Sequence, residues 1–301
     1  MDAPIETFDQ VLPHGITLAC RAAGPAGVDA PQVLCLHGFP EAAFVWDGVM
    51  QRLRERVRCV APDMRGFGDS SAPADIGAYR AAALMDDLEA LIDRLGRPVD
   101  LLVAHDWGGA IAWNLAAQRP SLMRRLLIVN SPHPATFLRE LRHNPAQRAA
   151  SAYMNFLCRP DAAALLEQDG YARLWPFFER MGGQAWLTEA LRSRYREVWG
   201  MGLTGGLNLY RASPLRPPSK ADPRVDQALQ AVQLPDAMTV SRVPTALLWG
   251  EGDHALLPGL LDGLERWVPD LHLTRVPEAS HWIVHERSDL VVAEIERALA
   301  S

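Results

Sequence analysis

One apolar run in the first half of the chain ends abruptly in small and polar residues, in the order Leu101-Leu102-Val103-Ala104-His105-Asp106-Trp107-Gly108-Gly109. Residues 101–104 have the length and continuity of a strand that is buried on both faces. The residues that follow, up to Gln118, have a helical pattern. The segment therefore predicts a strand that turns sharply at Asp106 into a helix, with small residues where the two elements come close.

Similar apolar runs recur along the chain, each ending in a turn or in small residues, at 33–36, 57–61, 126–129, 245–249 and 271–276. Helical patterns such as residues 81–95 separate several of them. This alternation indicates an α/β fold, with a mostly parallel central sheet flanked by helices on both faces. An antiparallel hairpin around Pro13-His14-Gly15 is expected before it. Such sheets carry their chemistry at the carboxyl ends of the strands, where Asp106 is expected to lie.

The alternation stops between two of the sheet-type strands. Residues 135–238 are helical in pattern, contain all the tyrosines except Tyr79, and end in a proline-rich segment at 214–223. We therefore predict one sheet core, made of residues 1–134 and 239–301, with an inserted helical cap at 135–238.

The composition of the 301 residues excludes some classes of function but does not identify one. The chain has 30 Lys and Arg against 36 Asp and Glu, a net charge of −6, which gives no basic footprint for nucleic acid. No apolar run is long enough to predict a membrane span, and the acidic segment at 1–6 does not predict a signal peptide. The four scattered cysteines are typical of buried, reduced thiols. We expect a cytoplasmic globular protein.

Asp106 has two interpretations on its own. An aspartate between a strand and a helix is most often an N-cap, but the same geometry is that of a nucleophile elbow with Asp where Ser is usual. Two further segments favour the elbow. His37-Gly38-Phe39-Pro40-Glu41 ends an earlier strand, and Ser280-His281-Trp282 follows the last strand. Nucleophile, acid and histidine in this chain order form the α/β-hydrolase arrangement.

Five ordered motifs, together spanning residues 34 to the C-terminus, resemble α/β hydrolases of the epoxide hydrolase and haloalkane dehalogenase group. They are His37-Gly38-Phe39-Pro40, Pro62-Asp63-Met64-Arg65-Gly66-Phe67-Gly68, His105-Asp106-Trp107-Gly108-Gly109, Trp249-Gly250-Glu251-Gly252-Asp253 and His281-Trp282. The one departure at the elbow is Ala104, which stands where Gly is usual. The resemblance implies an enzyme that needs no cofactor and no metal.

The residue type at the elbow indicates the reaction. A carboxylate attacks an sp3 carbon that bears a leaving group and becomes an alkyl ester of the enzyme, so Asp106 is the expected nucleophile. His281 is the expected general base for hydrolysis of that ester, with Asp253 as its acid partner. The backbone N–H groups of Phe39 and Trp107 are the expected oxyanion hole.

Each partner has rivals nearby. Glu251 competes with Asp253, but the Trp-Gly-x-x-Asp match favours Asp253. His254 and His285 compete with His281, and we expect His285 to be solvated at the start of the last helix. His37 is expected to hold a turn by hydrogen bonds, and the same role is open to His105.

The leaving group divides this enzyme group. Epoxide opening needs a proton donor for the alkoxide, and neutral phenols suit it, whereas a halide is bound by N–H donors such as Trp indoles. The segments Tyr153-Met154-Asn155-Phe156 and Asn208-Leu209-Tyr210-Arg211 resemble those that carry two cap tyrosines in epoxide hydrolases. Tyr153 and Tyr210 are therefore the expected donors to the epoxide oxygen. For Tyr171 and Tyr195 we expect aromatic packing with a wetted hydroxyl.

The halide alternative is weaker but stays open. Fluoroacetate dehalogenases begin the first of these segments with His-Trp, which is missing here, and Phe39 offers no side-chain N–H. Trp107 does not distinguish the two activities, because epoxide hydrolases and haloalkane dehalogenases both carry Trp after the nucleophile. A haloalkane or haloacetate dehalogenase with the same triad is the alternative, and a non-catalytic ligand-binding protein of this fold is the second alternative.

The preferred hypothesis is an epoxide hydrolase, a hydrolase acting on ether bonds, that converts an apolar small-molecule epoxide to a vicinal diol. Besides the catalytic groups, the expected substrate-binding residues are Trp107, Phe39, His105 and Phe156. No nucleic-acid or membrane partner is expected, and the chain is a monomer or a homodimer.

Overall fold

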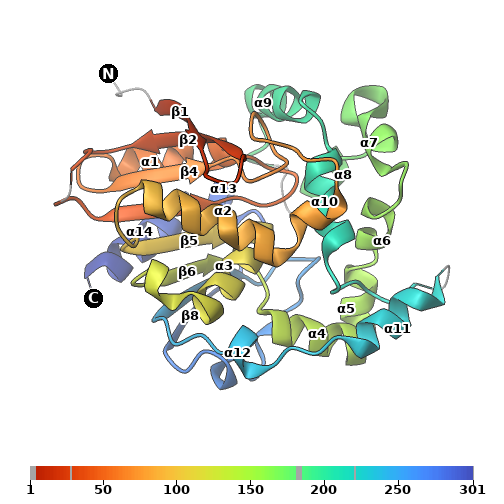
Figure 1. The fold of residues 1–301 in the computed structure, drawn as a ribbon. Helices are drawn as coiled ribbons and strands as arrows, with labels where there is room; N and C mark the ends of the chain where they lie inside the picture. Colours follow the sequence, from red (N-terminus) through yellow and green to blue (C-terminus); the bar gives the residue numbers. More distant parts are fainter. Residues whose placement is uncertain (1–4, 28, 181–184, 220–221, 301) are drawn as a thin grey trace.

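A computed structural model describes residues 5–27, 29–180, 185–219 and 222–300. Residues 1–4, on which the expectation about a signal peptide partly rests, lie outside the described residues. The described part is organised around an eight-stranded sheet with the spatial order β1-β2-β4-β3-β5-β6-β7-β8 (Figure 1). Its strands are β1 (Glu6–Val11), β2 (Thr17–Ala23), β3 (Gln32–Leu36), β4 (Arg58–Pro62), β5 (Leu101–His105), β6 (Leu126–Val129), β7 (Thr245–Gly250) and β8 (Leu271–Val276).

Strand directions confirm the expected mixed sheet. β1 and β2 form an antiparallel hairpin, in whose turn Gly15 has a φ of +84°. β2 pairs antiparallel with β4, and every neighbouring pair from β4 to β8 is parallel. Every residue of β3, β5, β6 and β7 is buried, which explains why each of these strands contains a continuous apolar run.

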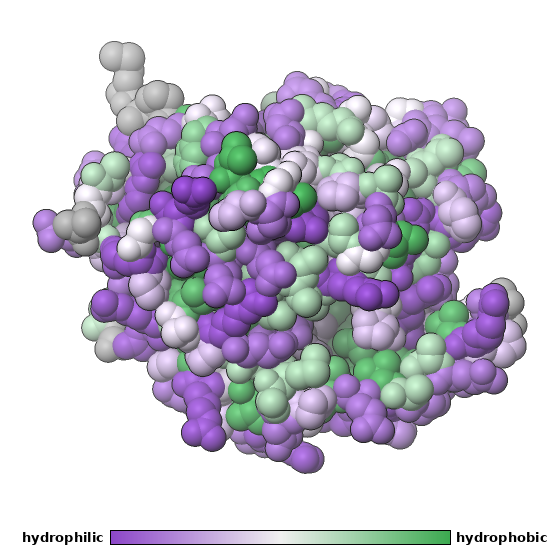
Figure 2. Space-filling view, viewed as in Figure 1, coloured by the Kyte–Doolittle hydropathy of each residue, from purple (hydrophilic) through white to green (hydrophobic). Residues whose placement is uncertain are grey.

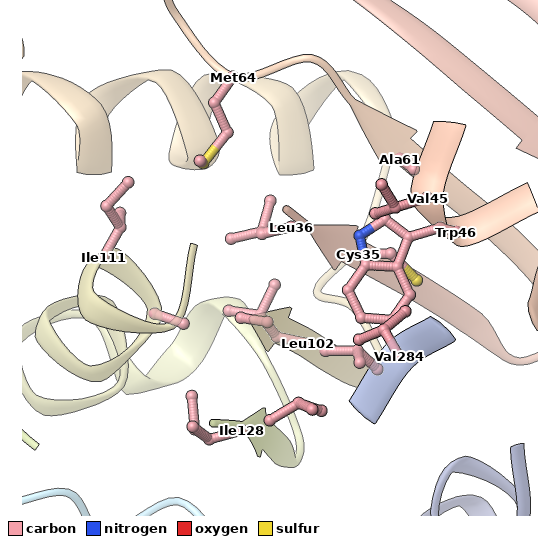
Figure 3. Packing of buried hydrophobic residues seen from close by; sticks show 14 of the residues in the cluster. Cys35, Leu36, Val45, Trp46, Ala61, Met64, Leu102, Ile111, Ile128 and Val284 are labelled. Carbon is pink, nitrogen blue, oxygen red and sulfur yellow. The ribbon is translucent and has the colours of Figure 1, made fainter. Parts of the chain in front are cut away.

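Helices cover both faces of the sheet. α2 (Ala81–Arg94) and α3 (Asp106–Gln118) pack together on one face, and α1 (Asp47–Leu53) and α14 (Ser288–Ala300) pack together on the other. In Figure 3, buried side chains from the sheet such as Leu36, Leu102 and Ile128 lie between Ile111 of α3 on one side and Trp46 and Val284 on the other. Short α13 (Ile283–Glu286) precedes α14, and 3-10 turns lie at Ala43–Trp46, Ile76–Tyr79, Pro120–Leu122, Pro258–Leu261 and Leu264–Arg266.

The segment between β6 and β7 forms the cap, which lies to the right of the sheet in Figure 1. Its helices are α4 (Pro134–His143), α5 (Pro145–Ala150), α6 (Tyr153–Leu157), α7 (Ala162–Tyr171), α8 (Trp175–Arg180), α9 (Glu189–Gly200), α10 (Thr204–Ala212), α11 (Pro223–Ala231) and α12 (Asp236–Thr239). Four residues separate the end of β6 from the first cap helix, α4, so the cap begins at the carboxyl edge of the sheet. That residues 135–238 form a unit of their own stays a prediction.

Two smaller expectations concern membranes and thiols. Within the described ranges, none of the helices combines the length and the apolar character that a membrane crossing requires. The cysteines are free; Cys20, Cys35 and Cys59 are buried and Cys158 is half-buried.

Candidate active site

The turn after β5 has the geometry of a nucleophile elbow. Asp106 has a φ of +49°, in the left-handed region that a non-glycine residue seldom adopts. A Cβ on Gly108 would lie 2.6 Å from the backbone oxygen of His37, and one on Gly109 would clash with Ser131. The small residues are therefore required by close packing around the turn, and the strained turn lifts the Asp106 side chain out of the sheet edge.

The Asp106 carboxylate lies between a backbone donor and a histidine. The Phe39 backbone N–H donates to Asp106 Oδ1 at 2.8 Å. His281 Nε2 lies 3.7 Å from Asp106 Oδ2. The loop that carries Phe39 is held in turn by His37, whose Nδ1–H donates to the Gly38 oxygen at 2.9 Å and whose Nε2 accepts from the Met64 backbone at 3.0 Å.

The His281 ring is oriented by Asp253, which follows β7. His281 Nδ1 donates to Asp253 Oδ2 at 2.6 Å, and Asn130 Nδ2 donates to the same oxygen at 3.0 Å. The other oxygen of Asp253 accepts from the backbone of Ala255 and Leu256, at 2.8 and 2.9 Å. The structure thus brings Asp106, Asp253 and His281 together: hydrogen bonds join His281, Asp253 and Asn130, and the Asp106 carboxylate lies 3.7 Å from His281 Nε2. The sequence analysis did not single out Asn130.

Burial and charge act on the pKa of His281 in opposite directions. Burial lowers it, but the charge and hydrogen bond of Asp253, with the charges of Asp106 and Glu41, raise the pKa to about 9. For Asp253, burial raises the pKa and His281 lowers it, and the net result is a lowered pKa. The alternative candidates for the acid partner and the general base lie outside this arrangement. Glu251 pairs with Arg275 at 3.0 Å, and His254 is exposed.

A cavity of about 210 Å³ opens in front of Asp106. The sheet core and the cap both line it, with Trp107, Tyr153, Tyr210, Phe137 and Leu256 among the lining residues. Figure 2 shows a hollow bordered by hydrophobic residues on this face, between the regions of α4 and α10. A mostly apolar cavity with a few polar groups at one end is the usual form of a small-molecule site.

The two cap tyrosines meet above the nucleophile. The Tyr210 ring lies 4.9 Å from the Trp107 ring, 5.4 Å from the Phe39 ring and 6.3 Å from the Tyr153 ring, centroid to centroid. Burial, followed by the charge of Asp106, raises the pKa of Tyr153, while its hydrogen bond with Tyr210 lowers it. Burial raises the pKa of Tyr210 as well, and a hydrogen bond with the Trp107 side chain opposes the rise. Both phenols are therefore protonated at neutral pH.

Three of the residues expected to bind substrate lie elsewhere. Phe39, Phe156 and His105 are not among the described residues that line this cavity. Phe39 is buried under the Tyr210 ring, and Phe156 is half-buried with the Arg159 guanidinium 6.0 Å from its ring centroid. His105 is fully buried behind the site, where its Nε2–H donates to the backbone oxygen of His281 at 2.9 Å. The prediction for His105 as a substrate contact is wrong, because hydrogen bonding turns its ring away from the cavity.

Sequence reasoning missed a buried carboxylate, Glu41, two residues after Phe39. Its Oε1 accepts from the Tyr195 hydroxyl at 2.6 Å and from His285 Nε2 at 2.7 Å, and its Oε2 lies 3.2 Å from His105 Nδ1. Burial raises the pKa of Glu41, but the nearby His105 and the hydrogen-bonded His285 outweigh burial and lower it. The expected wetted hydroxyl of Tyr195 and the expected solvated His285 are both wrong, since both contribute to this buried cluster. Glu41 itself was quoted in a motif, and a glutamate in an otherwise apolar turn was the available signal.

Comparisons with known proteins agree with this geometry. A family model described as the alpha/beta hydrolase fold matches residues 31–288. The chain belongs to the α/β-hydrolase family. An AB hydrolase superfamily protein of Bacillus subtilis is 35% identical over 92% of each chain. A protein named epoxide hydrolase 4 of Mus musculus is 30% identical over 94% of this chain and 76% of its own length.

Solved structures of α/β hydrolases extend the similarity to the whole chain. An epoxide hydrolase of Bacillus megaterium superposes with a TM-score of 0.87 at 28% identity, over 98% of this chain and 100% of that one. An epoxide hydrolase from metagenomes of hot environments has a TM-score of 0.87 at 34% identity and covers 99% of both chains. The fold prediction and the resemblance to hydrolases of the epoxide hydrolase group are confirmed.

Proposed function

We propose that this protein is an epoxide hydrolase, which converts an apolar epoxide to a vicinal diol through an ester on Asp106. The single observation that carries the proposal is the placement of two protonated phenols, Tyr153 and Tyr210, in the same cavity as the Asp106 carboxylate. A nucleophilic carboxylate on one side of a small ligand and proton donors on the other match the two ends of an epoxide ring.

In the first step an oxygen of Asp106 attacks an epoxide carbon, and the carbon–oxygen bond of the ring breaks. The departing oxygen takes a proton from Tyr153 or Tyr210, which leaves a phenolate. The alkyl ester that forms on Asp106 carries no charge. Because the Asp106 charge is one cause of the raised pKa of His281, esterification lowers that pKa and favours the neutral imidazole that a general base requires.

In the second step neutral His281 takes a proton from water, and the hydroxide adds to the carbonyl carbon of the Asp106 ester. The backbone N–H groups of Phe39 and Trp107 are proposed to stabilise the oxyanion. Collapse expels the alkoxide, which takes the proton from His281. The carboxylic acid that remains on Asp106 returns its proton to the phenolate, so that the enzyme is restored and water supplies all the atoms added.

The dehalogenase alternative needs N–H donors aimed at the leaving halide. The Phe39 side chain has no such donor, and the Trp107 ring packs edge-to-face against the Tyr210 ring, with centroids 4.9 Å apart. The contact between Trp107 and Tyr210 therefore favours the epoxide over the halide.

The test is to trap the ester. In a His281→Gln variant the first step proceeds and the second is blocked, so incubation with styrene oxide is expected to add the mass of one epoxide to the protein, on the peptide that contains Asp106. The matched control carries Asp106→Ala as well and gains no mass. An adduct with 1-bromobutane instead of styrene oxide would support the dehalogenase, and the absence of any adduct would support a ligand-binding protein.

A further inference from the structure

The buried Glu41 carboxylate joins four segments of the chain. Glu41 itself follows the loop of Phe39, Tyr195 comes from cap helix α9, His285 from α13, and His105 from the end of β5. Its side chain is fully buried, and so is that of Tyr195. A buried carboxylate is costly unless donors surround it, so the position of each donor matters to the others.

His105 connects this cluster to the general base. A carbonyl oxygen can only accept, so the 2.9 Å contact between His105 Nε2 and the His281 oxygen requires a proton on Nε2. The other ring nitrogen, Nδ1, lies 3.2 Å from Glu41 Oε2, and neither of these two buried atoms has a hydrogen-bond partner among the described residues. His105 is also the residue directly before Asp106. Its ring therefore spans from Glu41 to the backbone of His281, beside the strand that carries the nucleophile.

The cap reaches the same cluster through α9. The Tyr195 ring packs between Phe44 and Phe178, with centroids 5.0 and 4.8 Å away, and its hydroxyl donates to Glu41. One turn further along α9, Trp199 Nε1 donates to the Pro40 oxygen at 2.7 Å. Helix α9 thus docks on two consecutive residues of the loop that also carries the Phe39 N–H.

We propose that Tyr195 is a positioning residue for the general base: its cap-borne hydroxyl fixes the Glu41 carboxylate against the His105 ring, and the Nε2–H of that ring holds the backbone of His281. The packing of α9 on the Pro40–Glu41 loop is then coupled to the orientation of His281. The enzyme hydrolyses its ester efficiently only when α9 makes these contacts. This inference rests on the proposed function.

The proposal predicts an effect on one step. Alkylation uses Asp106 and the phenols of Tyr153 and Tyr210, none of which contacts Tyr195, whereas hydrolysis of the ester uses His281. A general stability role would instead slow both steps together or lower only the melting temperature. The discriminating measurement is therefore the rate of each step, not the overall turnover.

The first test is Tyr195→Phe, which keeps the ring packing and removes one donor to a buried charge. In single turnovers with styrene oxide, quenched and analysed by intact mass, we expect ester hydrolysis to slow about tenfold while alkylation keeps its rate, so that the alkyl-enzyme accumulates. The matched control is Tyr171→Phe, which removes the hydroxyl of another cap tyrosine that packs against Trp199. Equal slowing of both steps in Tyr195→Phe, or an unchanged rate of hydrolysis, would overturn the proposal.

The second test uses Glu41→Gln and a pH profile. The groups that face His281 are Asp253, Asp106, Glu41 and the His105 ring, whose centroid lies 4.8 Å from that of His281. Removing the Glu41 charge lowers the pKa of His281, so the pH at half-maximal ester hydrolysis is expected to move down. Asp87→Asn, which neutralises a buried carboxylate paired with Arg65, is the control for lost buried charge and leaves that pH in place.

The two proposals fail in different ways. If wild-type protein and His281→Gln both form no ester, the proposed function is wrong. If the wild-type enzyme forms and hydrolyses the ester but Tyr195→Phe behaves like Tyr171→Phe, only the positioning role is wrong. If the Glu41→Gln variant folds poorly, the comparison of Tyr195→Phe with Tyr171→Phe tests the positioning role by itself, because Tyr195→Phe keeps the buried aromatic ring.

Discussion

In the sheet core, Asp106, Asp253 and His281 lie in turns at the ends of strands, and hydrogen bonds of 2.6 to 3.0 Å hold Asp253 and the His281 ring. In the cap, Tyr153 and Tyr210 lie on two short helices, and rings at 4.9 to 6.3 Å surround Tyr210. Hydrogen bonds fix direction, whereas ring packing tolerates small displacements. We infer that the nucleophile and the base in the core are held in fixed positions, whereas the two proton donors in the cap can shift. Each prediction below tests either the core or the cap.

The largest effect is expected in the core, at Asp106. Both Asp106→Ala and Asp106→Gly remove the nucleophile, and we expect diol formation to fall by about 10⁴-fold or more in either variant. The two variants differ only in backbone freedom. Because Asp106 has a φ of +49°, the glycine variant is expected to be more stable than the alanine variant by about 1 kcal/mol.

The measurements for this pair are steady-state diol formation and urea denaturation. Equal stability of the two variants would mean that the turn after β5 relaxes when the carboxylate is lost, which would weaken the contrast between a rigid core and an adjustable cap.

The next effect belongs to the cap phenols. Loss of one hydroxyl, in Tyr153→Phe or Tyr210→Phe, leaves the other to donate, so the rate of alkylation is expected to fall about tenfold to a hundredfold in each. The double variant is expected to lose at least about a further tenfold, while hydrolysis of a preformed ester keeps its rate. Pre-steady-state kinetics with styrene oxide separates the two steps. Turnover that survives in the double variant would rule out the phenols as donors.

A smaller effect is expected where the cap meets the core. A Cβ on Gly205, in the first turn of α10, would clash with the backbone of Gly66 in the loop after β4. Gly205→Ala is therefore expected to shift α10 and Tyr210 with it, slowing alkylation about tenfold and destabilising the protein by about 1–3 kcal/mol. The matched control is Gly200→Ala, where the nearest atom would be 3.8 Å away. Alkylation that is equally fast in both variants would show that Tyr210 tolerates displacement of its helix.

The core was more predictable from sequence than the cap, for physical reasons. A strand buried on both faces is continuously apolar, and the residue that follows it, such as Asp106, is placed at the sheet edge by topology alone. The predicted strands at 101–104, 126–129 and 271–276 agree with β5, β6 and β8 to within one residue. The positions of residues on the short cap helices are not fixed by such a pattern, because these helices are placed by packing against residues that are distant in the sequence.

The errors concern side chains whose environment is built from distant segments. His105, Tyr195 and His285 surround Glu41, and Tyr195 is 154 residues away from it along the chain. No local pattern marks such a cluster, so Tyr195 looked like a packing residue and His285 like a solvated one. The roles of Tyr153 and Tyr210 came from a family resemblance rather than from periodicity, and they remain to be tested.

The smallest effect at neutral pH is expected at His133, where the chain passes from the core into the cap. Its Nδ1 accepts from the Ala135 backbone at 3.2 Å, and its Nε2–H donates to the Thr239 oxygen at 2.9 Å, so it joins the segments that enter and leave the cap. The bond from Ala135 needs a neutral ring, because protonation of Nδ1 would remove its acceptor, whereas Nε2–H can donate in either state. Burial lowers the pKa of His133 to about 4, although the bond to Thr239 opposes this.

The sign of the pH dependence follows from that shift. Above the ordinary histidine pKa of about 6.5 both the folded and the unfolded chain carry a neutral ring, and the contribution of His133 is complete. Between that pH and about 4 the unfolded chain binds a proton that the folded chain excludes, so the free energy of unfolding decreases. In urea denaturation, His133→Asn is expected to be less stable than wild type at pH 7, with a difference that shrinks from pH 6.5 to 4. A constant difference over this range would mean that the junction opens and admits the proton, and that the connection between core and cap is itself adjustable.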